Sequence, residues 1–264
     1  MNTTSIQDLV RRNPLAFSAL VAGTVLAINL VLKLGSVALS LELSVLTTGG
    51  LSAALLSAVG ALAITRLGLW HELGLLGWPA RLRTLAWFLP FVALGGLPWI
   101  TAAPTLTPAV AAAAVAFGVL NAFWKLGFLG LLMYAWLPRG ERFAAAVAAG
   151  VWGVMHLAGI LLGARVVPTL VLAAAYVLLS FGFAGVWMRT RLLWPLVGAY
   201  ALLEGSAVAI FRDSGASNLA TSAADLLPLM YGSLLLAGYG LLALPRRKTS
   251  EEPGLRGRVV GGTA

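Results

Sequence analysis

The chain contains no cysteine, only two histidines and few charged residues. Without cysteine it can form neither disulfides nor thiolate metal sites, and it has no cysteine nucleophile. Charged residues make up 10% of the 264 residues, whereas about a quarter is usual in soluble domains. Together with a hydrophobic share of 60%, this scarcity excludes an ordinary soluble domain and indicates an integral membrane protein.

What the chain has instead is a series of apolar blocks, each long enough to cross a hydrocarbon core of about 30 Å as a helix. The blocks are rich in Ala, Leu, Val and Gly and do not alternate, which favours helices over barrel strands. We therefore predict an all-α, polytopic membrane protein with about eight transmembrane helices. The predicted spans are 15–36, 44–65, 84–103, 108–137, 143–163, 166–188, 192–211 and 224–244.

These spans form a single predicted domain over residues 15–245. Residues 1–14 are expected to be a cytoplasmic N-terminus that leads into a retained first helix, because the first span is too long for a signal peptide. Residues 246–264 are expected to be a disordered cytoplasmic tail, with no CaaX box for prenylation. Residues 66–85 mix tryptophan and leucine with charges, which predicts an element at the cytoplasmic interface.

The net charge of +9 could point to nucleic acid, but the basic residues fall in alternate loops. With both termini cytoplasmic, 14 of the 18 Lys and Arg residues lie on the inner side, as the positive-inside rule requires. The charge therefore indicates topology in a multi-pass plasma-membrane protein. It predicts contact with the lipid bilayer and its anionic headgroups and no nucleic-acid partner.

Three ionisable residues lie inside the spans: Lys125, His156 and Glu204. A charge at the bilayer centre costs about 2.5–3.5 kcal/mol on insertion scales, so such residues usually face the protein interior. Each lies 13 or 14 residues from the cytoplasmic end of its span, which is about 20 Å at 1.5 Å per residue. We expect one buried polar cluster, with Asn121 and Tyr200 one helical turn away.

Two interpretations of this cluster are open. It is either a site that polarises a bond or coordinates an ion, or a structural Lys125–Glu204 ion pair with His156 hydrogen-bonded to a neighbour on its own helix.

Four stretches resemble a known family in their order and spacing: "ELGLLGWPARLRTL", "NAFWKLGFLGLL", "WGVMH" and "RTRLLWPLVGAYALLEG". The chain resembles the CPBP family, the Abi or CAAX-protease-like intramembrane endopeptidases, over about residues 68–206. That family includes the type II CAAX prenyl endopeptidases. The resemblance implies a core of eight helices, a bacterial origin and a motif order of EExxxRG, FxxxH, and Trp-Pro followed by HxxxN or HxxxB.

The second motif matches, with Trp152 and His156 at the aromatic and histidine positions of FxxxH. In the third, Tyr200 stands at the histidine position and Glu204 at the following Asn or Asp position.

The first motif has lost both glutamates. In one register Asn121 and Ala122 occupy the glutamate positions, and in the other Lys125 occupies the arginine position. Asn121 cannot serve as a general base, because its amide takes up no proton near neutral pH.

The resemblance implies that a glutamate activates water while histidines bind a metal or stabilise the oxyanion. Here the candidate catalytic residues are His156, Glu204, Asn121, Tyr200 and Lys125. His156 and Glu204 are also the candidate ligands of a divalent metal such as zinc, but a catalytic zinc normally takes three protein ligands.

We therefore expect a pseudoprotease, or a weakly active enzyme in which Glu204 has become the base, with a membrane-embedded peptide or protein as its partner. The alternative is a small-molecule or ion transporter that uses Lys125, His156 and Glu204, although no internal repeat is evident. The protease-like interpretation predicts that Asn121, His156, Tyr200 and Glu204 converge in one cavity.

Overall fold

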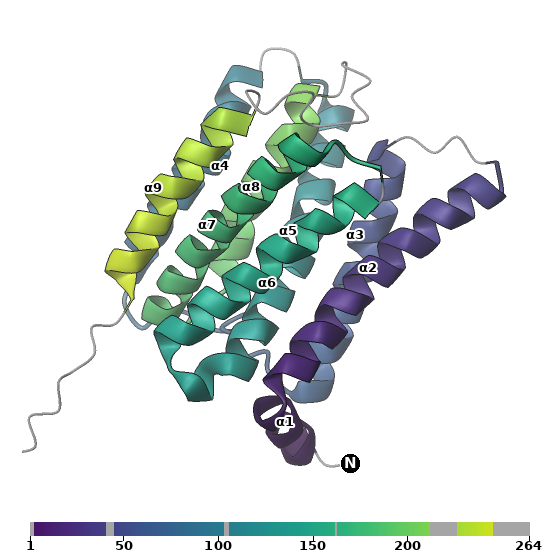
Figure 1. The fold of residues 1–264 in the computed structure, drawn as a ribbon. Coiled ribbons are helices and arrows are strands. Elements are labelled where there is room, and N and C mark those ends of the chain that lie inside the picture. The colour runs from purple at the N-terminus through teal and green to yellow at the C-terminus, as the bar shows by residue number, and fades with distance from the viewer. Residues whose placement is uncertain (1–2, 41–44, 103–105, 162, 212–225, 245–264) are drawn as a thin grey trace, which may run out of the picture.

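The computed structural model describes residues 3–40, 45–102, 106–161, 163–211 and 226–244, and this part of the chain is helical without any strand. The predicted tail, 246–264, lies outside the described residues. A short helix, α1, precedes eight longer ones, α2 to α9, which match the eight predicted spans one by one (Figure 1). The elements are α1 Thr3–Arg12, α2 Pro14–Ala38, α3 Val45–Leu67, the 3-10 helix η1 Leu82–Phe88, α4 Leu89–Ala102, α5 Pro108–Trp136, the 3-10 turn η3 Leu137–Arg139, α6 Glu141–Leu161, α7 Val166–Thr190, α8 Trp194–Phe211 and α9 Leu227–Ala243.

The all-α, polytopic prediction is confirmed. Within the described residues, six stretches are long and apolar enough to cross a membrane: Pro14–Ala38, Thr47–Leu67, Leu82–Ile100, Pro108–Arg139, Glu141–Leu161 and Val166–Thr190. The helices α8 and α9, with 18 and 17 residues, are not among these six. That they also cross the membrane, which would complete the predicted eight crossings, stays a prediction. Large apolar side chains point outward, such as Leu20 at 65% and Leu235 at 76% exposure, as a lipid-facing surface requires.

Several helices begin and end where the sequence carries the usual signals. Pro14 opens α2 and Pro108 opens α5, at the first helical position where the missing N–H costs nothing. The Thr107 side chain caps α5 by accepting a hydrogen bond from the amide of Val110. Gly140, with φ of +108°, makes the turn between η3 and α6.

Helix α5 is the centre of the bundle. Its residues 124–135 are all buried, and it packs against α3, α6 and, most extensively, α8. The contact with α8 is close because a Cβ on Gly118 would lie 2.2 Å from the carbonyl oxygen of Ala201. Only a glycine allows the two backbones to approach this far, and the approach places the polar residues of α5 beside those of α8.

The predicted interfacial segment is folded against the bundle. Residues 68–81 are turns, and the carbonyl of Gly74 accepts hydrogen bonds from the amides of Leu193 and Trp194 at 3.0 and 3.2 Å. Leu73 is fully buried. The segment therefore braces the junction of α7 and α8 with one face.

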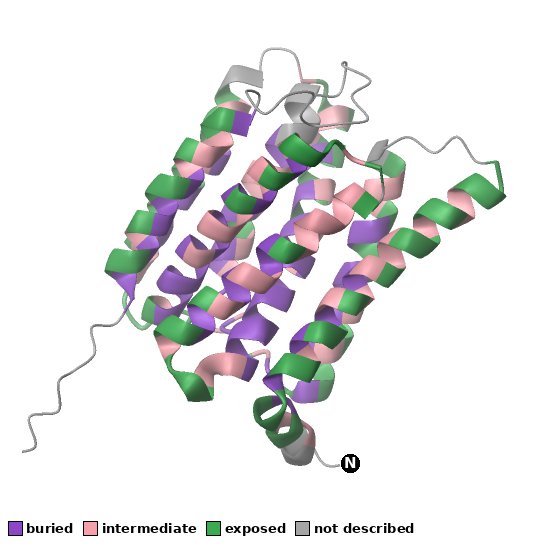
Figure 2. Cartoon of the chain, viewed as in Figure 1, coloured by how far each residue is buried: buried purple, intermediate pink, exposed green. Residues whose placement is uncertain are grey.

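The two ends of the described chain lie at the same end of the bundle (Figure 1). Helix α1 sits there beside the start of α2, and α9 also ends there. Helix α2 stands at the edge of the bundle (Figure 2). Its buried residues all lie in its first half and are Pro14, Ser18, Val21 and Val25.

Candidate functional site

A buried ion pair joins α5 to α8 at the centre of the bundle. The Lys125 ammonium lies 2.6 Å from Oε1 of Glu204, and the two side chains are 10% and 12% exposed. Each charge neutralises the other where water is scarce. An unpaired charge at this depth would be strongly destabilising. Lys125 and Glu204 are thus brought together as the sequence predicted.

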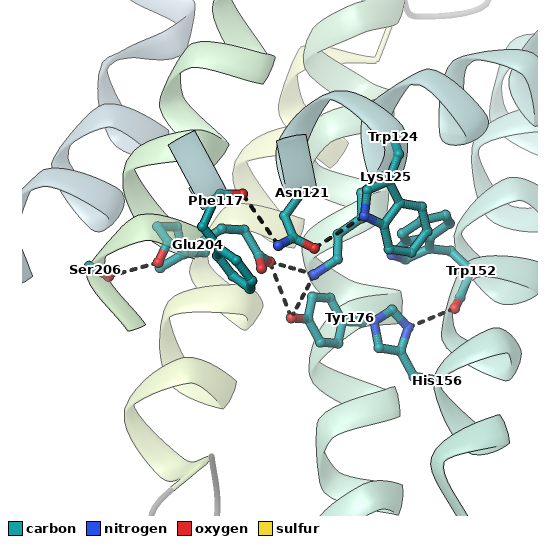
Figure 3. A network of polar contacts seen from close by, with 10 residues as sticks. Phe117, Asn121, Trp124, Lys125, Trp152, His156, Tyr176, Glu204 and Ser206 are labelled. Atoms are coloured by element: carbon teal, nitrogen blue, oxygen red, sulfur yellow. Dashed lines mark hydrogen bonds and ion pairs between the residues drawn. The ribbon is translucent and has the colours of Figure 1, made fainter. Parts of the chain in front are cut away.

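Tyr176 on α7 completes this cluster. Its hydroxyl accepts a hydrogen bond from Lys125 at 3.5 Å and donates one to Oε1 of Glu204 at 3.4 Å. Its ring stacks on the His156 ring with centroids 3.8 Å apart and planes 18° apart (Figure 3). Tyr176 therefore stands between His156 and the ion pair.

Tyr176 was not predicted as a member of the cluster, although the sequence carries a signal for it. Tyr176 lies 14 residues before Thr190, the last residue of α7, which is the same spacing that placed the other polar residues at one level. A depth count extended to tyrosines would have included it.

His156 is held by its own helix. Its Nδ1 lies 2.9 Å from the backbone carbonyl of Trp152, and since a carbonyl only accepts, Nδ1 carries the hydrogen. This leaves Nε2 as an acceptor in the neutral imidazole. The contacts of His156 and of the Lys125–Glu204 pair match the structural interpretation that the sequence left open.

Asn121 and Tyr200 do not contact His156 through any hydrogen bond in the described part of the chain. The Asn121 amide donates to the carbonyl of Phe117 at 3.3 Å, and its oxygen accepts from Nε1 of Trp124 at 3.1 Å. The Tyr200 ring lies 5.5 Å from the Lys125 ammonium. The Tyr200 hydroxyl is buried close to Tyr176 and Glu204, but no hydrogen bond of ordinary geometry reaches it from the described residues.

A cavity of about 280 Å³ borders the cluster between α2, α3, α5 and α6. Asn121, Lys125 and His156 line it, whereas Tyr200 and Glu204 do not. The prediction that Asn121, His156, Tyr200 and Glu204 converge in one cavity is therefore wrong for Tyr200 and Glu204. The physical reason is that Glu204 turns toward Lys125 and Tyr176.

The residues present do not fit a catalytic metal. No group of three His, Asp or Glu side chains lies together in the described ranges. The ring of Tyr176 stands between His156 and Glu204, and the Glu204 carboxylate is already paired with an ammonium. A zinc ion normally needs three protein ligands with free lone pairs, and this arrangement does not offer them.

Comparison with protein-family models, with curated proteins and with solved structures finds no match to this chain.

Proposed function

We propose that the chain is a CPBP-like integral membrane protein that has lost hydrolysis and that holds a membrane-embedded ligand without cutting it. The proposal keeps the resemblance carried by the Trp152–His156 motif and by the Trp-Pro stretch at the start of α8. The helices that carry the three motif positions, α5, α6 and α8, pack around one polar cluster, which supports a retained site with altered chemistry.

The observation that carries the proposal is the Lys125–Glu204 ion pair. A general base needs a free lone pair within hydrogen-bond reach of water. Glu204 is the carboxylate of the cluster, and an ammonium 2.6 Å from its Oε1 competes for that lone pair. Lys125 thus occupies the place where a peptidase would need water.

The proposed orientation has both termini in the cytoplasm of the cell that makes the protein. It is supported by the basic residues, since the helix ends and turns at the α1 end of the bundle hold most of them, including Arg66, Arg139 and Arg191. The plasma membrane is the proposed location.

A cleavage assay tests the loss of hydrolysis. Purified wild-type protein, His156→Ala and Glu204→Gln are each incubated with a library of membrane peptides, and products are read by mass spectrometry. Equal background rates in all three are expected. Cleavage by the wild type that falls in both variants would overturn the proposal.

The alternative, a transporter, draws support from a buried charged cluster at mid-depth. However, residues 124–135 of α5 are all buried, so the cytoplasmic half of this helix lines no open path from the cluster. Ion or proton flux into proteoliposomes that is lost in Lys125→Met would establish transport instead.

A further inference from the structure

The cavity beside Lys125 is too small for a helix. Its volume of about 280 Å³ is close to the lower end of small-molecule sites, which span about 300–1,000 Å³. A helix with its side chains is about 10 Å across and would fill more than this space in a single turn. A thin, unbranched chain is the kind of occupant that fits.

The cavity lies next to the lipid. Val25, Leu26 and Asn29 of α2 form one wall, and Val25 is the last buried residue of that helix. Beyond it α2 leaves the bundle, and Val31 and Leu34 are 67% and 58% exposed (Figure 2). A hydrocarbon chain in the cavity can therefore continue along α2 into the bilayer.

Most polar atoms of the cavity wall are already satisfied. Ser52 donates to Asn29 at 2.9 Å, and the Asn29 amide donates to the carbonyl of Val25. Asn121 is engaged on both sides by its own helix. These groups offer little further hydrogen bonding to a ligand.

Two polar groups of the wall have capacity left. Nε2 of His156 is an acceptor without a partner in the described residues, because the ring bonds only through Nδ1. The Lys125 ammonium has three hydrogens and spends two of them, on Glu204 and Tyr176. One acceptor and one donor, both beside the ring of Tyr176, are thus available at the polar end of an otherwise apolar and aromatic cavity (Figure 3).

We propose that this cavity binds the carboxyl end of a long-chain fatty acid that enters sideways from the bilayer. The acid O–H donates to Nε2 of His156 and its carbonyl oxygen accepts from Lys125, while the alkyl chain leaves past α2. The uncharged acid is the form that fits, because Glu204 already neutralises Lys125 and a second carboxylate would stay unpaired. The inference rests on the proposed function, since it assumes a ligand that is held, and it adds the ligand's chemical class.

Tryptophan fluorescence provides the test, because Trp124 and Trp152 line the cavity. The full chain in lipid nanodiscs is titrated with stearic acid brominated near its carboxyl end, so that the contact quencher lies in the cavity, and with the methyl ester of the same acid. The ester has the same chain but no O–H for His156. We expect saturable quenching by the acid and only the linear quenching of bilayer partition by the ester.

Three variants assign the site. Ala158→Phe fills the cavity, and His156→Phe removes Nε2 while keeping an aromatic ring against Tyr176, so both should lose the saturable part. Val154→Phe is the matched control, because it adds the same ring to the same helix at a position 65% exposed, and it should behave as wild type. Elution as a single species in size-exclusion chromatography checks folding.

Identical curves for acid and ester, or saturable quenching that survives in both Ala158→Phe and His156→Phe, would overturn the inference. The peptide assay above is independent of this result. Cleavage by the wild type would remove the proposed function even if the acid binds, and absence of binding would leave the loss of hydrolysis intact.

Discussion

At the scale of residues, the protein's most consequential feature is a lysine on α5 that pairs with a glutamate on α8. Removing one member of a buried pair costs about 3–5 kcal/mol because the other charge is left uncompensated, whereas replacing both with apolar residues is often neutral or stabilising. The pair thus explains why two charges persist in an apolar bundle. It does not by itself stabilise the fold more than leucine would.

The first prediction concerns this pair. Lys125→Met and Glu204→Gln are each expected to lower the free energy of unfolding in detergent by about 3–5 kcal/mol, and Lys125→Met with Glu204→Leu to recover most of the loss. Glu141→Gln is the control, since it breaks an exposed pair with Arg191 that is worth about 0–1 kcal/mol. Additive losses in the double variant would contradict the account.

The second prediction compares two tyrosines of the cluster. Tyr176→Phe loses two hydrogen bonds of its hydroxyl and should lower the free energy of unfolding by about 1 kcal/mol. Tyr200→Phe removes a buried hydroxyl that makes no hydrogen bond of ordinary geometry and should leave stability unchanged or raise it by up to about 1 kcal/mol. Thermal unfolding of both variants in the same detergent decides, and a larger loss in Tyr200→Phe would show a partner for its hydroxyl.

At the scale of elements, the site depends on how closely α5 approaches α8. The polar residues sit on different helices, and small residues at the crossing bring their side chains within hydrogen-bond distance. Gly205, next to Glu204, mirrors Gly118: a Cβ on it would lie 2.7 Å from the carbonyl oxygen of Ala114. The ion pair is therefore a consequence of helix packing as much as of its own charges.

The third prediction follows from this crossing. Gly118→Ala places a methyl group against the backbone of α8 and should lower the free energy of unfolding by about 1–3 kcal/mol through overpacking. Gly198→Ala on α8 is the matched control, because a Cβ there meets nothing within 4 Å; it should be neutral or stabilising by up to about 1 kcal/mol. Equal effects of the two changes, measured by thermal unfolding, would argue against a tight crossing.

At the scale of the whole molecule, the bundle buries its polar groups and presents leucines outward, as a protein in lipid must. The described chain begins and ends at one end of the bundle (Figure 1), which fits an even number of crossings. Basic residues gather at the helix ends on that side, which is the support for the proposed orientation with cytoplasmic termini.

The fourth prediction tests this topology, and the absence of cysteine makes it simple. Single cysteines replace Asp8 on α1 and Leu39 at the opposite end of α2, both of which are exposed. A membrane-impermeant maleimide should label Leu39→Cys in intact cells and Asp8→Cys only after permeabilisation. The reverse pattern would invert the proposed orientation.

The sequence by itself determined the helical class, the positions of the long helices and the common depth of Lys125, His156 and Glu204. Each of these follows from local properties: run length, hydropathy and a rise of 1.5 Å per residue. The helix over residues 3–12 was missed because a segment of 10 residues is marginal as an isolated helix, although Ile6, Leu9 and Val10 follow helical spacing.

Only the tertiary structure decided which polar groups touch. It placed Tyr176 between His156 and Glu204, turned Glu204 away from the cavity and docked residues 68–81 on the junction of α7 and α8. These contacts depend on how each helix is rotated about its axis and on close backbone approaches such as that at Gly118. Rotation and approach are set by packing between segments far apart in the chain, and a hydropathy pattern read along one segment does not contain them.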